Sequence, residues 1–250
     1  SRITNVKKLF MIVEICANSF ESARNAQEAG AHRIELCSEL EVGGITPSYG
    51  LIKQVVTLLS IPVFVLIRPR SGDFNYSEAE FEIMKNDIEL CKRLGCSGIV
   101  SGVLNLDNSI DQLRTQELLE LAKPLPFVFH RAFDLVPDPI NALNVLMEIG
   151  VQRVLTSGQE STALSGLQLI QKLKNEAKNR ITILPGGGIN LENAMQFKKA
   201  GLNEIHCSLS TFHQHAIPPK ISMKNPVYFN DFGKAISDYS KILALVKLVQ

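Results

Sequence analysis

The stretch AGAHRIELC, residues 29 to 37, contains the pattern that decides the fold: a glycine followed four positions later by a β-branched residue. Gly30 suits the left-handed position that follows many helix C-termini. The apolar run after it is typical of a short strand buried on both faces. The pattern recurs in LGCSGIVSG, IGVQRVLTSG and AGLNEIHCS, whose glycines are residues 95, 150 and 201. The chain is therefore predicted to alternate helices with buried strands.

Four more strands are predicted between these repeats, and the total of eight indicates the fold class. They cover residues 11–16, 62–68, 126–131 and 180–188. Helix-start signals lie between the strands: Ser77 with Glu80 fits a capping box, Asp138 before Pro139 fits an N-cap, and Asn190 is a further candidate cap. Eight strands alternating with helices over 250 residues favour an α/β fold, a (β/α)8 TIM-type barrel in a single domain.

The two ends of the chain and the segment after the eighth strand complete this organisation. Residues 231–249 are predicted to form the last helix. Residues 209–230 are predicted to form an unusually long loop after strand eight, which is a lid, a contact surface or a mobile segment. Residues 1–10 precede the first strand as an N-terminal extension or the remnant of a tag.

Composition argues against several classes of function for this chain. Its 26 basic and 25 acidic side chains give a formal charge of +1, so no nucleic acid partner is expected. No apolar segment reaches the roughly 20 residues that a membrane span needs, and residues 1–10 lack a signal peptide's pattern. The five cysteines show no CxxC spacing, which argues against a disulfide framework. A cytoplasmic protein with reduced thiols is expected.

Polar side chains gather where the predicted strands end, which is the end of a barrel that carries active sites. Strand alternation directs these side chains into the barrel: Glu14, Cys16, Glu35, Cys37, Arg68, His130 and His206. Because a buried carboxylate needs a partner, Arg68, His130 and Arg131 are the cations expected beside the glutamates. The sequence thus predicts an acid/base site in which Glu14, Glu35 and His130 move protons. A purely structural ion network is the alternative.

An anion site is predicted where strands seven and eight end, in LPGGGI at 184–189 and HCS at 206–208. Glycines allow close approach of the backbone to an anion, and a helix starting near Asn190 would add its dipole. Gly187, Gly188 and Ser208 are the candidates for holding phosphate. A glycine-rich turn without a ligand is an equal alternative.

The five cysteines fall into two groups. Cys91 and Cys96 flank a helix end and are predicted to be small core residues, and Cys207 is expected to point outward if His206 points inward. Cys16 and Cys37 occupy equivalent positions on neighbouring strands about 4.8 Å apart. Two such thiols suit a soft ion such as Cu(I), and a disulfide or inert packing are the alternatives.

The motifs VEICANSFESARNAQEAGAHRIELC, GGITPS, IPVFVLIRPRSGDFNYS, FHRAFD, RVLTSG, ILPGGGI and EIHCS together resemble the CutC family of copper homeostasis proteins. The resemblance covers roughly residues 11 to 215. It implies a TIM-type barrel, a cytoplasmic location and self-association into homo-oligomers. It also implies that Cys16 and Cys37, which match the family's two strand-end cysteines, bind copper.

Three functions therefore stand as hypotheses. The first is a copper-associated protein that binds Cu(I) through Cys16 and Cys37. The second is a barrel enzyme acting on a small anionic or phosphorylated metabolite, with Arg68 and Arg131 holding the anionic group. The third is a scaffold or partner-binding barrel whose polar interior only stabilises the fold.

Overall fold

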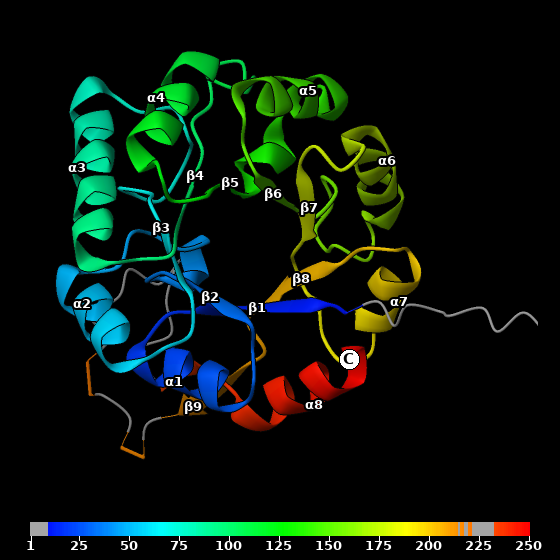
Figure 1. Ribbon diagram of the computed structural model, residues 1–250. Helices are drawn as coiled ribbons and strands as arrows, with labels where there is room; N and C mark the ends of the chain where they lie inside the picture. Colours follow the sequence, from blue (N-terminus) through cyan, green and yellow to red (C-terminus); the bar gives the residue numbers. More distant parts are fainter. Residues whose placement is uncertain (1–9, 215, 218–219, 222–232) are drawn as a thin grey trace, which may run out of the picture.

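The computed structural model describes residues 10–214, 216–217, 220–221 and 233–250. Eight parallel strands surround a central axis, and helices form a ring outside them (Figure 1). The barrel strands are β1 (Ile12–Ala17), β2 (Arg33–Leu36), β3 (Val63–Leu66), β4 (Gly98–Ser101), β5 (Phe127–Phe129), β6 (Arg153–Thr156), β7 (Thr182–Pro185) and β8 (Glu204–Cys207). The predicted (β/α)8 barrel is confirmed.

The helices follow the strands in regular alternation. They are α1 (Phe20–Glu28), α2 (Tyr49–Leu58), α3 (Glu78–Leu94), α4 (Gln112–Ala122), α5 (Pro139–Ile149), α6 (Leu167–Ala177), α7 (Ala194–Lys199) and α8 (Tyr239–Val249), with short 3-10 helices at Leu40–Val42 and Arg131–Leu135. The capping box of Ser77 with Glu80 and the Asp138 N-cap are both present.

The strands pair in the order β7-β6-β5-β4-β3-β2-β1-β8, and a bridge between Gly186 and His206 joins the two ends of this order. The barrel is therefore nearly closed. The four glycines of the repeat, at positions 30, 95, 150 and 201, have φ angles of 84°, 81°, 91° and 77°. A left-handed backbone after each helix turns the chain into the next strand, as the pattern predicts.

The segment after β8 differs from its prediction. Ser210–Gln214 forms a strand, β9, which pairs antiparallel with β10 (Gly233–Ser237), so residues 210–214 are not a loop and residues 233–237 are not part of the last helix. Asp238 accepts the N–H groups of Ser240 and Lys241, which starts α8 at Tyr239. Residues 1–9, 215, 218–219 and 222–232 of the predicted extension, loop and helix lie outside the described residues.

A second difference lies between β7 and α7. Asn190 was expected to cap a helix, but its side chain accepts the N–H groups of Glu192 and Asn193, while Asn193 accepts the N–H of Asn190. These reciprocal bonds form a turn, and the helix begins only at Ala194. The turn at Asn190 thus precedes α7, which has only six residues.

Candidate functional site

The barrel interior is built by strand alternation. Val13 and Ile15 of β1, with Ile34 and Leu36 of β2, belong to the core between the strands and the helices. Cys16 and Cys37 belong to a separate cluster inside the barrel, whose other members are Phe64, Leu66, Val100, Val128, Leu155 and Leu184. The predicted inward direction of the two cysteines is confirmed, and Cys91, Cys96 and Cys207 lie in the helix-side core, as expected.

A buried ion network lies in the barrel around Arg33. Arg33 is in register with Glu14 on β1, and its guanidinium donates to Glu14 and, at 2.6 Å, to Glu204. Arg153 donates to the same Glu204 carboxylate at 2.6 and 3.0 Å. The cations expected beside the glutamates, Arg68, His130 and Arg131, are not the partners of Glu14. The partner of Glu14 is Arg33 instead, because the register of β1 and β2 places Arg33 directly beside this carboxylate.

Glu14 also orients His206. Register places His206 of β8 opposite Glu14, and its Nδ1–H donates to Glu14 Oε1 at 2.6 Å. Burial alone would raise the pKa of Glu14, but Arg33 and His206 lower it to about 2, so the carboxylate is ionised. Burial would lower the pKa of His206, but its hydrogen bonds with Cys16 and Glu14 raise it well above the usual value. Glu14 thus holds the imidazole in a defined orientation.

The two cysteines meet at the end of β1 and β2. Cys16 is in register with Glu35, so Cys37 lies one inward position further along, yet the two Sγ atoms are only 3.7 Å apart. Gly44, with φ of 86°, brings the following loop so close that a Cβ there would lie 2.8 Å from Leu66 Cδ2 and 3.6 Å from Cys37 Sγ. A hydrogen bond with Cys37, together with burial, raises the pKa of Cys16 well above the usual value. Without a metal, this thiol is therefore protonated.

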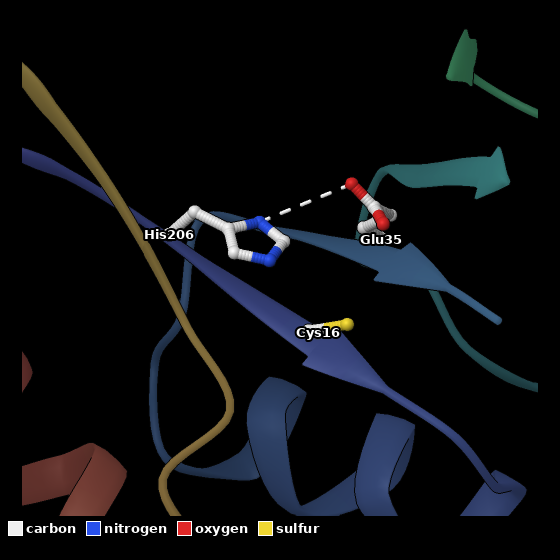
Figure 2. Close-up of side chains that lie close together, drawn as sticks. All are labelled: Cys16, Glu35 and His206. Atoms are coloured by element: carbon white, nitrogen blue, oxygen red, sulfur yellow. Dashed lines mark ion pairs between the residues drawn. The ribbon is translucent and has the colours of Figure 1, made fainter. Parts of the chain in front are cut away.

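Cys16, Glu35 and His206 are a group of potential metal ligands in the described part of the chain, and their ligand atoms lie within 4.8 Å of one another. Figure 2 shows the sulfur of Cys16 and the carboxylate of Glu35 on the same side of the imidazole, with His206 reaching in from β8. Burial, with the charge of Glu14, raises the pKa of Glu35 to about 7 although His206 opposes the shift. Sulfur and imidazole donors together suit a soft or borderline metal ion.

A cavity of about 310 Å³ opens beside these residues. Cys16 and His206 line it, and so do most of the side chains predicted for a site: Glu35, Arg68, His130, Arg131, Gly187, Gly188 and Ser208. Glu14 and Cys37 are not among the lining residues, since Glu14 lies behind His206 and Cys37 behind Cys16. The structure thus brings the predicted residues to one cavity, with Glu14 as a supporting residue.

Arg131 lies at the exposed side of this cavity. Its Nε donates to Asp134 at 2.8 Å, and its Nη2 donates to the Ser157 hydroxyl at 2.8 Å. Asp134 also accepts the N–H of Ser157, so these residues form one hydrogen-bonded cluster. The cluster holds Arg131 on the cavity wall although its side chain is 45% exposed.

His130 is buried and neutral. Burial lowers the pKa of its imidazole to about 3, and the charge of Arg68 adds to this shift. The unfolded chain takes up a proton on this residue below about pH 6.5, while the folded protein does so only near the lowered pKa. The contribution of His130 to stability is therefore complete above pH 6.5 and is lost as the pH falls toward 3.

We expect a His130→Phe variant to lose stability less steeply with acidification. Between pH 6 and 4, the unfolding free energy of the wild type should fall by up to about 1.4 kcal/mol per pH unit more than that of the variant. Urea unfolding across this range measures how the unfolding free energy of each protein depends on pH. Comparing these two slopes is independent of any loss of stability that the substitution causes equally at every pH. Parallel slopes would show that His130 titrates normally in the folded protein.

Two features of the site were not predicted. His206 was predicted to point inward but not to be a metal ligand. The register between β8 and β1, which pairs His206 with Glu14, brings it to the ligand group. Arg33, Glu204 and Arg153 carried no sequence signal as a network, because they stand on three strands that are far apart in the chain. Their partnership depends on which strands become neighbours when the barrel forms.

The fold and this site define a (β/α)8-barrel protein with paired thiols, an imidazole and a carboxylate at the ends of strands β1, β2 and β8. None of the helices in the described ranges is long and apolar enough to cross a membrane. Residues 11–211 match the family model described as the CutC family. The chain belongs to the CutC family.

Individual relatives agree with this assignment. The chain is 44% identical to the human copper homeostasis protein cutC homolog over 238 residues, which cover 94% of this chain and 87% of the relative. It is 42% identical to a CutC family protein of Histophilus somni, covering 96% and 100% of the two chains. A crystal structure of a CutC protein from Streptococcus agalactiae superposes with a TM-score of 0.76 at 35% identity, covering 80% of this chain and 99% of that one.

Proposed function

We propose that this protein binds Cu(I) through the sulfur atoms of Cys16 and Cys37, with His206 as a third ligand, as part of copper homeostasis. The observation that carries the proposal is the 3.7 Å separation of two buried sulfur atoms, of which that of Cys16 belongs to a residue lining the cavity. Thiolates are the side chains that Cu(I) prefers. The relatives named for copper homeostasis support the same ion.

The distance between the sulfur atoms fits one shared metal ion. Two metal–sulfur bonds of about 2.3 Å would place the sulfur atoms about 4.6 Å apart only if the three atoms were collinear. At 3.7 Å the two bonds enclose a bent angle, which leaves one side of the ion free for a third ligand. His206 offers a ligand atom within 4.8 Å of the Cys16 sulfur, which makes it the candidate for this third position.

His206 also has the support that metal-binding histidines usually have. Its Nδ1–H is bonded to the ionised carboxylate of Glu14, and Arg33 holds that carboxylate from behind. A carboxylate behind a histidine fixes the ring and makes its other nitrogen a better ligand. Binding would displace the protons of both thiols and of the free imidazole nitrogen.

We further propose that the protein acts in the cytoplasm as a homo-oligomer. The five cysteines are all free in the structure, which agrees with a reducing compartment. Self-association is the expectation that follows from the family.

The test is anaerobic titration of reduced protein with Cu(I) in competition with a calibrated chelator, followed by X-ray absorption at the copper edge. One Cu(I) per chain with two sulfur neighbours and one nitrogen neighbour is the expected result. A protein that retains no Cu(I), or holds it without sulfur neighbours, would overturn the proposal. A parallel titration with Zn(II) tests the choice of metal, and tighter binding of Zn(II) would also count against copper.

A further inference from the structure

Unpartnered polar atoms gather at the cavity. Five buried side-chain nitrogen or oxygen atoms in the described residues have no hydrogen-bond partner: Glu35 Oε2, Arg68 Nε, Tyr76 Oη, Thr115 Oγ1 and His130 Nε2. Three of these belong to residues that line the cavity, namely Glu35, Arg68 and His130. Native proteins leave few buried polar groups unpaired, and such groups require an explanation. A ligand with acceptor oxygens would provide partners for the donors of Arg68 and His130, while Glu35 Oε2 lies 3.9 Å from His206 Nδ1.

His130 is a hydrogen-bond donor at this wall. Its Nδ1 accepts the N–H of Ala132 at 3.2 Å, so the ring hydrogen of the neutral imidazole is on Nε2, the unpartnered atom. The ring packs so closely on Gly102 that a Cβ there would lie 2.7 Å from His130 Cε1. Phe74 packs on the ring at a centroid distance of 4.9 Å. These contacts fix the position of the ring. The Nε2–H group is therefore available to an acceptor atom of a ligand.

Two of the residues that line the cavity carry a guanidinium group. Arg68 is buried and donates to the carbonyl oxygens of Val42, Gly44 and Gly72 at 2.7 to 2.8 Å, but no described carboxylate lies within ion-pair distance of it. Arg131 adds a second guanidinium, whose Nε donates to Asp134 at 2.8 Å. Glu35 is the one acidic side chain among the lining residues. A buried arginine without a carboxylate partner calls for an anion.

We propose that this cavity binds a small molecule through an oxyanion group, which accepts a hydrogen bond from His130 Nε2 and is attracted by Arg68 and Arg131. The group is a carboxylate or a phosphate, since both offer acceptor oxygens and negative charge. A volume of about 310 Å³ is at the lower limit for small-ligand sites, so the ligand is compact. This site goes beyond copper binding, because a metal ion held by the thiol pair occupies neither His130 nor the two arginines.

The test uses reduced, metal-free protein, so that its outcome is independent of Cu(I) binding. Calorimetric titrations with oxalate, malonate and inorganic phosphate are compared with malonamide, a neutral molecule of similar shape to malonate. At least one of the anions should bind at one site per chain, and malonamide should not. The preferred anion identifies the group as carboxylate or phosphate. Absence of binding for all three anions at 10 mM, about the weakest affinity such a titration detects, would overturn the proposal.

Variants locate the site. His130→Phe removes the donor and should weaken the preferred anion about tenfold or more. Arg131→Gln changes a partly exposed residue whose replacement the fold tolerates more easily, and it should weaken binding several-fold. Thr115→Val is the matched control, since Thr115 also has an unpartnered buried oxygen but does not line the cavity. Anion affinity unchanged by both His130→Phe and Arg131→Gln would place the binding elsewhere and overturn the proposal.

Discussion

Replacing Cys16 and Cys37 together by serine is expected to lower the affinity for Cu(I) by about a thousandfold or more. Serine keeps the size and position of each side chain but offers a hydroxyl oxygen, a hard donor that Cu(I) binds poorly. The two sulfur atoms are 3.7 Å apart, so the double substitution removes two ligands of one ion. Competition with a calibrated chelator, at one fixed pH because thiol protons are displaced, measures the change.

The chain offers a matched control for this variant. Cys91 and Cys96 are also buried, but they lie in the core between strands and helices. Replacing both by alanine should leave the affinity for Cu(I) unchanged, even if it lowers stability. Should the Cys16→Ser, Cys37→Ser protein bind Cu(I) as tightly as the wild type, copper binding through the thiol pair would be refuted.

Replacing Arg33 by methionine is expected to destabilise the protein by about 3–5 kcal/mol. Methionine retains much of the apolar volume of arginine but leaves Glu14 without its principal cation and removes one of the two cations at Glu204. Both carboxylates are buried, so water cannot replace the lost partner. Denaturant unfolding of the two proteins at pH 7 gives the difference in unfolding free energy.

A surface arginine provides the comparison for Arg33. Arg24 pairs with Glu28 across one turn of α1 at 3.9 Å, and its side chain is 48% exposed. Arg24→Met should therefore change the unfolding free energy by less than about 1 kcal/mol. A loss of the same small size for Arg33→Met would mean that the buried network does not stabilise the barrel. Adding Glu14→Gln to Arg33→Met should restore part of the lost stability, because it removes the uncompensated charge.

More of the fold than of the site could be predicted from the sequence. The Gly30 type of repeat predicts where helices end and strands begin, because a left-handed residue after a helix is a local requirement. The inward direction of Cys16 and Glu35 was also predictable, since alternation along a strand is local. The strand at residues 210–214 was missed because its partner, β10, is separated from it by a long connection.

The site required information that no local pattern contains. The sequence names Arg68, His130 and Arg131 as cations for the glutamates, whereas register places Arg33 and His206 beside Glu14. Pairing across β8 and β1 joins residues that are 192 positions apart in the chain. A shift by two residues in either register would exchange these partners without changing the pattern of inward and outward side chains.

The sequence by itself determined the barrel, the family and the set of polar side chains that face the barrel interior. These depend on periodicity along single strands and on motifs that are read in order. The tertiary structure alone decided that two sulfur atoms lie 3.7 Å apart, that His206 joins Cys16 and Glu35, and that the described partners of Arg68 are carbonyl oxygens. Those facts depend on how neighbouring strands are staggered around the barrel, which is a property of all eight strands together.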